Sequence, residues 1–322
     1  MVVRNISALW FREQSFVFTW EDFYAGAMVA MECNLGFILL FLVMYGCYRI
    51  PSLKTPFGIL MINQNGAQLL ACINSGFFFY AGACFNFKPI VTHSYIFGNL
   101  SIFLLPVILG SFMLMSLNRV CAATLPFQYH RIFGPRMLKI YIIGNWLIPV
   151  IPTIYVLFFR ECNFIFYHYG WLFTSAPWTE TCGSVLLLYA AFIQIILSAL
   201  ILGADLTTLV FLMFFRNKIY QSHNAETRRR EFNFAGQVLL QGVVFLVHGF
   251  WYDLGYNVLP GNSEKWKTFF TTSFSSNLLH VFDPIIVFAF NREFRRWIIP
   301  RKKSSVTPQH KVTVVSSIGP VV

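Results

Sequence analysis

Charged residues are scarce in this chain. Asp, Glu, Lys and Arg make up only 11% of its 322 residues, whereas they make up about a quarter of a typical soluble domain. Hydrophobic residues contribute 57%, and 37 residues are Phe. The composition excludes a soluble domain, and it also excludes a disordered chain, because disorder requires low hydrophobicity. A membrane protein that crosses the bilayer several times is the class that remains.

Sequence motifs of enzymes are also missing. The chain contains no Gly-rich phosphate loop, no His-Glu-x-x-His zinc motif and no nucleophile elbow. We therefore expect no enzymatic activity, no cofactor and no metal ion. The net charge of +11 would suggest nucleic acid binding in a soluble protein. We expect none here, because the basic residues lie mostly in short segments between long apolar runs.

Seven apolar segments are long enough to cross a bilayer as helices, which takes about 20 residues each. A helix satisfies all its backbone hydrogen bonds internally, as hydrocarbon requires. The predicted spans are residues 23–48, 57–82, 93–117, 137–159, 184–215, 232–259 and 268–290. Residues 291–299 follow as a short amphipathic helix that we expect on the membrane surface. The predicted fold class is therefore an all-α membrane protein, a seven-transmembrane helix bundle with a C-terminal amphipathic surface helix.

The distribution of basic residues predicts the orientation of the chain. Most of the 24 Lys and Arg residues follow the first, third, fifth and seventh spans. Cytoplasmic segments carry such an excess, so we expect a multi-pass plasma-membrane protein with residues 1–22 outside, residues 300–322 in the cytoplasm, and lipids as partners. Residues 1–22 lack the apolar core of a cleavable signal peptide. Asn5 begins a glycosylation sequon on the predicted outer side.

A motif at the inner end of the third span points to a family. The chain reads L-N-R-V-C-A-A-T-L-P-F-Q-Y there, with Pro126 seven residues and Tyr129 ten residues after Arg119. This pattern resembles the D-R-Y…P-x-x-Y signature of rhodopsin-like G-protein-coupled receptors. Asn118 stands where those receptors usually carry an acid.

The seventh span carries a second motif of the same family. Asp283 and Pro284 begin the run D-P-I-I-V, and Phe294 follows in F-A-F-N-R-E-F. The arrangement resembles the N/D-P-x-x-Y…F signature of rhodopsin-like receptors, with Val287 in place of the Tyr. Pro removes a backbone donor and breaks the regular helix, so the resemblance implies an activation switch at Asp283 and Pro284.

The whole chain resembles the nematode serpentine receptor class x chemoreceptors over about residues 30–299. The runs L-N-R-V-C-A, C-N-F-I-F-Y…W-L-F…C, R-R-R-E-F-N-F and D-P-I-I-V-F-A-F-N-R-E-F-R occur in that family's order. The resemblance implies that residues 23–299 form a receptor domain that binds an extracellular small-molecule ligand and activates a heterotrimeric G protein. It also makes the ciliary membrane of sensory neurons an expected location. A transporter or ligand-gated channel is the alternative, although the internal repeats and charge rings that would favour it are missing.

The resemblance further implies which residues contact the G protein. They are Asn118, Arg119, Pro126, Tyr129, Arg228, Arg229 and Arg230. Because Asn118 cannot form the usual ion pair with Arg119, we predict a weaker restraint on the inactive state and some basal activity. Gln68 occupies the position of an Asp in the second span, so we expect the sodium site of the family to be weakened or absent.

Candidate ligand-pocket residues lie in the third, sixth and seventh predicted spans. They are Ser101, Trp251, Tyr252, Asp253, Asn277 and His280. Acids inside a membrane span mark polar cavities, which makes Asp253 the first candidate, although an acid at the outer water interface is an equal alternative. Relative to the family motifs, Ser101 replaces the Asp of amine receptors and Asn277 replaces the Lys of opsins. We therefore expect neither an amine receptor of the usual kind nor a visual pigment.

Three cysteines lie in predicted outer segments, where oxidation can occur. They are Cys84, Cys162 and Cys182. Rhodopsin-like receptors tether the top of the third span to the second outer loop, but the matching position here is about Ser94. We therefore favour a disulfide between Cys162 and Cys182 within the loop. Pairing of Cys84 with either of them is the alternative, because the sequence alone does not determine connectivity.

Overall fold

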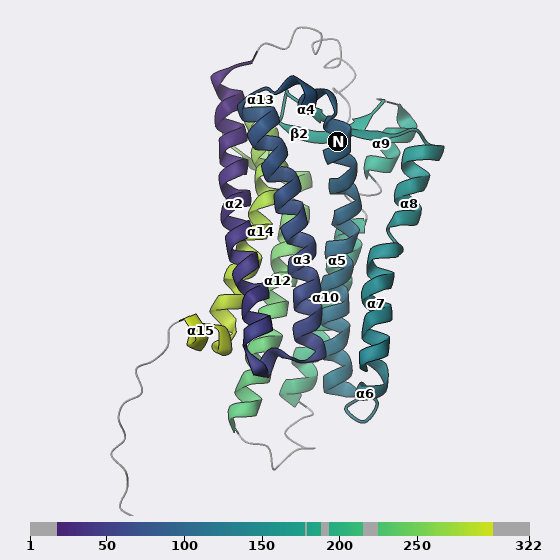
Figure 1. Cartoon of the computed structure of the whole chain (residues 1–322), viewed down its shortest axis with the longest axis vertical. Helices are drawn as coiled ribbons and strands as arrows, with labels where there is room; N and C mark the ends of the chain where they lie inside the picture. The colour runs from purple at the N-terminus through teal and green to yellow at the C-terminus, as the bar shows by residue number, and fades with distance from the viewer. Residues whose placement is uncertain (1–17, 178, 188–192, 215–224, 299–322) are drawn as a thin grey trace, which may run out of the picture.

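The computed structural model describes residues 18–177, 179–187, 193–214 and 225–298. It is an elongated bundle of helices that run side by side along its long axis (Figure 1). The long helices are α2 (Trp20–Arg49), α3 (Pro56–Phe78), α5 (Ser94–Thr124), α7 (Pro135–Leu147) with α8 (Val150–Ile154), α10 (Gln194–Phe214), α12 (Ala225–Val258) and α14 (Ser273–Phe290). The shorter helices are α4 (Lys88–Thr92), α6 (Tyr129–Ile132), α9 (Glu180–Leu187), α13 (Glu264–Thr271) and α15 (Arg292–Ile298). Asn5 and both chain tails lie outside the described residues.

Within the described residues, six helical segments are long and apolar enough to cross a membrane. They are Trp20–Arg49, Pro56–Cys84, Ser94–Thr124, Pro135–Phe159, Gln194–Phe214 and Glu264–Phe290. The predicted sixth span lies in α12, which has 34 residues and packs between α10 and α14. Its polar residues, among them Gln237, Gln241 and His248, lower its mean hydropathy. The predicted seven-helix bundle is thus confirmed, with α12 as a long helix of more polar composition.

The packing order of the helices closes a ring. α2 packs against α3 and α14, α5 packs against α3 and α10, and α12 packs against α10 and α14. α7 and α8 lie against the outside of α5, so few of their side chains are buried. Two described helices, α9 and α10, fall within the predicted fifth span.

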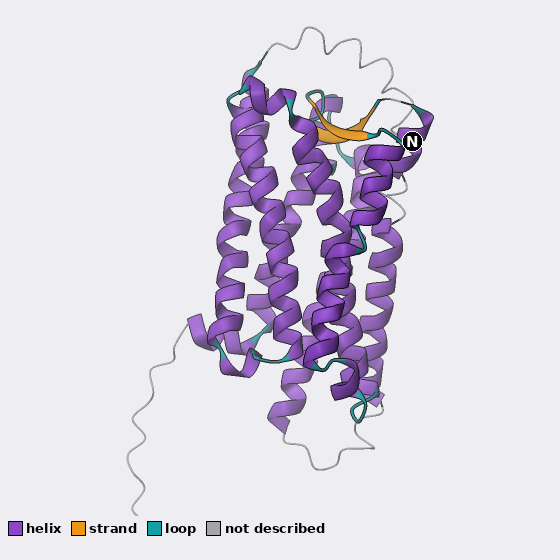
Figure 2. Ribbon diagram, turned by 45° about the vertical axis from the view of Figure 1, so that its right-hand side comes forward, coloured by secondary structure: helices purple, strands orange, loops and turns teal. Residues whose placement is uncertain are grey.

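A β-hairpin crosses one end of the bundle (Figure 2). Strand β1 (Asn163–Tyr167) pairs antiparallel with β2 (Leu172–Ala176). A disulfide joins Cys162 to Cys182, which confirms the favoured pairing, and Cys84 is a free, buried cysteine. The hairpin approaches α5 at Gly98, where any Cβ would overlap the carbonyl of Phe164. Glycine is required there because only a residue without a Cβ allows this contact.

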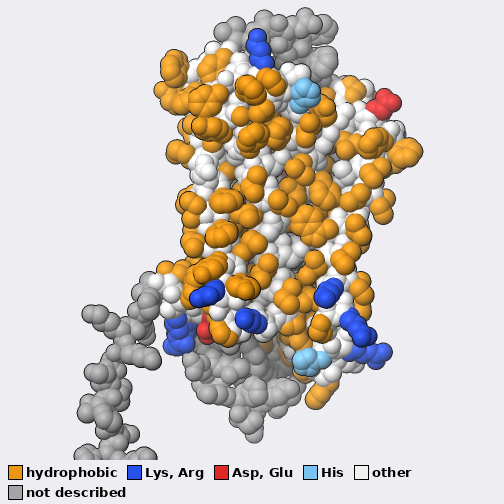
Figure 3. Space-filling view, viewed as in Figure 1, with side chains coloured by type: hydrophobic (Ala, Val, Ile, Leu, Met, Phe, Trp, Pro, Cys, Tyr) orange, Lys and Arg blue, Asp and Glu red, His pale blue; other side chains and the backbone are white. Residues whose placement is uncertain are grey.

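The opposite end of the bundle is basic, and we call it the basic end. Its exposed basic side chains are Arg49, Lys54, Arg131, Arg136 and Lys139. Figure 3 shows Lys and Arg side chains gathered at this end below a surface of hydrophobic side chains. Exposed apolar area of this extent is what a bilayer would cover. The basic residues therefore lie at the end where the positive-inside rule would place the cytoplasm.

Helix α15 turns away from α14 at the basic end. Its Phe294 is fully buried and packs edge-on against Phe288 with ring centroids 5.7 Å apart. On α2 it meets Gly46, where a Cβ would overlap the Phe294 ring. A second ring of α15, Trp297, lies 5.7 Å from Tyr45 of α2. α15 is therefore packed against the bundle through two aromatic side chains, and its location on a membrane surface stays a prediction.

Candidate functional site

A cavity of about 200 Å³ lies between the hairpin and the middle of the bundle. Its walls come from α3, α5, α10, α12 and α14, and Phe164 and Phe173 of the hairpin cover it. Most of the lining is apolar, and its polar side chains include Ser101, Gln194, His248, Ser276, Asn277 and His280. None of the described lining residues is Asp, Glu, Lys or Arg. An apolar cavity with a few placed hydrogen-bonding groups is the usual form of a small-molecule site.

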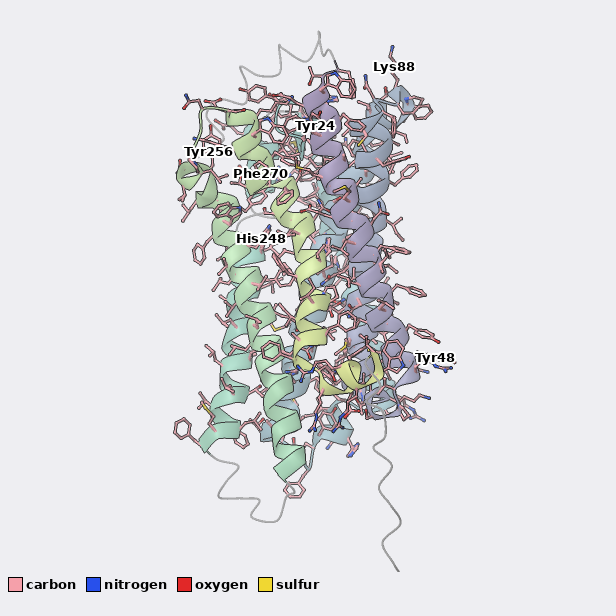
Figure 4. All side chains as sticks on the ribbon, turned by 90° about the vertical axis from the view of Figure 1, so that its left-hand side faces the viewer. Tyr24, Tyr48, Lys88, His248, Tyr256 and Phe270 are labelled. Carbon is pink, nitrogen blue, oxygen red and sulfur yellow. A yellow bond between two sulfur atoms is a disulfide. The ribbon has the colours of Figure 1, made fainter. Side chains whose placement is uncertain are left out.

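His248 connects three helices at this cavity. The Gln194 Nε2 atom lies 2.7 Å from His248 Nδ1, and the Ser276 Oγ atom lies 3.2 Å from His248 Nε2. These contacts join α10, α12 and α14 through one imidazole ring. Figure 4 shows His248 below Tyr256 and Phe270, in the half of the bundle nearer the hairpin. His248 is not among the residues predicted from the sequence, although a polar residue inside a predicted span is a signal that points to it.

The structure brings four of the six candidate pocket residues together. Ser101, Tyr252, Asn277 and His280 line the cavity. The Ser101 hydroxyl oxygen accepts a hydrogen bond from Asn74 Nδ2 (2.9 Å), and the Asn277 Oδ1 atom accepts one from Cys33 (3.3 Å).

Trp251 and Asp253 lie outside the lining of the cavity. Trp251 donates its indole N–H to the carbonyl of Phe270 at 3.2 Å, and Asp253 is exposed on the other side of α12. The reason is helical geometry, because successive residues of a helix point about 100° apart. Three consecutive residues therefore cannot all face one cavity, and Tyr252 is the one that does.

The hairpin is held over the cavity by buried polar contacts. The Trp171 Nε1 atom donates to Asp22 Oδ1 at 2.8 Å, and the two side chains are 0% and 1% exposed. The Lys265 Nζ atom lies 3.4 Å from Asp22 Oδ1, 3.5 Å from Glu21 Oε2 and 3.9 Å above the Trp171 ring. We call Asp22, Trp171 and Lys265 the hairpin cluster. It connects α2, the hairpin and α13.

His168 lies in the hairpin turn close to the hairpin cluster. Burial lowers the pKa of its imidazole to about 4, an effect that the carboxylate of Asp22 opposes and the ammonium of Lys265 reinforces. A charged histidine is therefore disfavoured in the folded hairpin, because it would lose its hydration and lie close to a cation.

Asp283 is the centre of a polar cluster in the middle of the bundle. Its Oδ2 atom accepts hydrogen bonds from Gln64 Nε2 (2.5 Å) and Gln68 Nε2 (3.1 Å), both on α3. Its Oδ1 atom accepts one from Gln241 Nε2 (2.5 Å) on α12. Gln68 also lies 3.4 Å from the ring of His280, measured from its Oε1 atom to Nδ1. The cluster therefore begins at the floor of the cavity and reaches α12.

The predicted coupling residues lie partly together at the basic end. Arg119 is 8% exposed and stacks on Phe57, with its Cζ atom 4.6 Å from the ring centroid. It lies within electrostatic range of Asp205, a buried acid of α10. The Asn118 Nδ2 atom donates to the Tyr129 hydroxyl oxygen at 3.1 Å.

Pro126 and the three arginines of α12 are placed differently. Pro126 lies in an exposed turn between α5 and α6. Arg228, Arg229 and Arg230 lie in the first turns of α12, and their side chains are outside the described part of the structure. The Asn118 and Tyr129 pair therefore contributes a contact that fixes the turn carrying Pro126 to the end of α5.

Comparison with known proteins defines the class and then the family. The fold matches the crystal structure of squid rhodopsin with a TM-score of 0.65 over 88% of this chain and 86% of that chain, at 16% identity. The protein therefore has the fold of the rhodopsin-like seven-helix receptors. The family described as Serpentine type 7TM GPCR chemoreceptor Srx matches residues 31–291. The chain belongs to this family, which is one of receptors rather than enzymes.

Two nematode relatives from Caenorhabditis elegans are consistent with this membership. Serpentine receptor class X-43 is 55% identical over 98% of this chain and 99% of the relative. Serpentine receptor class X 45 is 24% identical over 85% of this chain and 80% of the relative. The similarity to the first extends along nearly the whole of both chains.

Proposed function

We propose that this chain is a chemosensory receptor of the plasma membrane that binds a small molecule from outside the cell and activates a heterotrimeric G protein inside it. In this proposal the hairpin end and residues 1–22 are extracellular, the basic end is cytoplasmic, and sensory cilia are the expected location. One observation carries the proposal: a covered cavity lies at one end of the bundle, and Arg119 of the family motif lies near the other, with the Asp283 cluster between them.

The ligand would act through α12, which lines the cavity with Phe245, His248 and Tyr252. His248 of α12 contacts Gln194 of α10 and Ser276 of α14, so a ligand that hydrogen-bonds to His248 would compete with one of these contacts. A ligand shifts an equilibrium only by its difference in affinity between the two states. Binding that favours a displaced α12 would therefore increase the population of the form in which Arg119 faces the G protein.

An agonist screen on cells that express the full chain with a promiscuous G protein tests the proposal. Odorants and peptides are applied from outside, and a second messenger is measured. We expect a saturable response that Arg119→Ala abolishes at equal surface expression. A ligand-evoked signal that survives Arg119→Ala, or an ion current without a G protein, would favour a channel or transporter.

A further inference from the structure

The contacts of Asp283 divide between two helices. One carboxylate oxygen accepts from Gln64 and Gln68 of α3, and the other accepts from Gln241 of α12. Asp283 is 2% exposed, the two α3 glutamines are 0% exposed, and Gln241 is 1% exposed. Since all three groups that contact the carboxylate are N–H donors, the arrangement fits an ionised carboxylate, which can only accept hydrogen bonds.

A movement of α12 would affect the two carboxylate oxygens of Asp283 differently. Gln64 and Gln68 are four residues apart, so they lie on the same face of α3 and hold the carboxylate from one direction. Gln241 is the donor from α12. Movement of α12 away from the bundle would remove that donor and leave a buried carboxylate oxygen without it, which is costly for a charged group.

We propose that the hydrogen bond from Gln241 to Asp283 is the restraint that holds α12 in the resting receptor, and that Gln64 and Gln68 keep the carboxylate in place when α12 moves. The proposal deepens the receptor function proposed above and rests on it. Gln241 is thus a positioning residue for the activation switch, because it acts through Asp283 rather than on the ligand or the G protein.

The first test compares Gln241→Leu with Gln237→Leu in the full chain. Gln237 is the matched control, because it is also buried (1% exposed) and lies one turn away on α12, but it is not a donor to Asp283. Basal second-messenger signalling is measured without ligand at equal surface expression. We expect Gln241→Leu to raise it about tenfold, the shift that corresponds to about 1.4 kcal/mol, and Gln237→Leu to leave it unchanged.

A second readout needs neither ligand nor G protein. Spin labels are attached at Ala122→Cys on α5 and Ala225→Cys at the first residue of α12, with Cys121 replaced by Ser, and the distance between them is measured in the purified full chain. We expect Gln241→Leu to populate longer distances than Gln237→Leu does. If the distance widens but signalling does not rise, the restraint stands and the proposed coupling to a G protein fails.

Three outcomes would overturn the restraint. The first is an unchanged distance distribution in Gln241→Leu, and the second is equal widening in Gln237→Leu. The third is that Gln241→Leu widens the distance as much in an Asp283→Asn background as it does alone. If Gln241 acts through Asp283, its effect on the distance must shrink when Asp283 is changed. If the leucine variants do not reach the surface, Gln241→Asn replaces them, since it keeps the amide on a shorter side chain and should give the same widening.

Discussion

Replacing Trp171 with Phe should lower the stability of the receptor, because it removes the indole N–H that donates to Asp22 at 2.8 Å. Hydrogen bonds to charged groups contribute about 1.5–3 kcal/mol. The two side chains are 0% and 1% exposed, so water cannot readily replace the lost donor. We expect a loss of about 2 kcal/mol from the bond, and a further loss from the space that the smaller ring leaves.

A double-mutant cycle separates the contribution of the hydrogen bond from the cost of the smaller side chain. Trp171→Phe, Asp22→Ala and the double variant are compared with the wild type. The contacts of Asp22 with Thr19 and Lys265 are lost in both variants that lack Asp22, so their contribution cancels in the cycle. The coupling energy between Trp171 and Asp22 should be about 1.5–3 kcal/mol.

Thermal unfolding of the purified receptor in detergent measures these changes. A fluorogenic maleimide can report unfolding through the buried thiols of Cys33, Cys47, Cys72 and Cys84. Trp266→Phe is the control, because the hydrogen bond from its indole N–H to Glu21 is exposed and 3.4 Å long and should contribute no more than about 1 kcal/mol. Additivity of the two single variants within about 0.5 kcal/mol would refute the reasoning.

Three further predictions concern the hairpin and the end of α5. Lowering the pH from 6.5 toward 4 should destabilise the fold, because folding lowers the pKa of His168 from 6.5 to about 4 and the unfolded chain therefore binds the proton first. The free energy of unfolding should fall by up to about 1.4 kcal/mol per pH unit. An equal fall in His168→Phe would contradict this. Asn118→Asp should lower basal signalling at equal surface expression, because the added carboxylate can pair with Arg119; an unchanged basal level would reject it. Cys182→Ser should cost about 2–4 kcal/mol of stability, since it opens a link across 20 residues; Cys121→Ser is the control, and equal unfolding temperatures would disprove it.

The helices could be predicted from the sequence because the bilayer leaves few alternatives to a long apolar helix. Interruptions inside a span were not predicted, such as the break between α7 and α8 near Pro149. The hydropathy of an apolar segment is the same whether its helix is continuous or broken. The hairpin was also missed, although N-F-I-F-Y and L-F-T-S-A are short aromatic and β-branched runs typical of strands.

The candidate site was only partly predictable. Asn118 and Tyr129 are local neighbours, so their spacing in a motif was enough to group them. The contact of Gln241 with Asp283 joins residues 42 apart in sequence, and it depends on how α12 is rotated against α14. The sequence contains no local signal for that rotation. The same limit explains why Tyr252 lines the cavity whereas the acid next to it does not.

Asp283 and Asp205 are both buried, at 2% exposed each, and interact with different helices. Asp283 accepts a hydrogen bond from Gln241 of α12, whereas Asp205 belongs to α10 and lies within electrostatic range of Arg119 on α5. Gly242 of α12 lies opposite Asp205, since a Cβ at this glycine would be 3.5 Å from the Asp205 Oδ2 atom. A glycine presents no side chain that could hold this carboxylate. Asp205 should therefore join α5 to α10 without restraining α12.

Asp205→Asn is consequently expected to differ from Gln241→Leu in its effect on the resting receptor. Removing the negative charge weakens the attraction to Arg119, so a spin-label distance between α5 and α10 should broaden. The distance between α5 and α12 should stay at its wild-type value, because the bond to Asp283 is intact. Both distances are measured in the purified full chain without ligand. If Asp205→Asn widens the distance between α5 and α12 as much as Gln241→Leu does, the position of α12 depends on the buried charges collectively and not on Asp283.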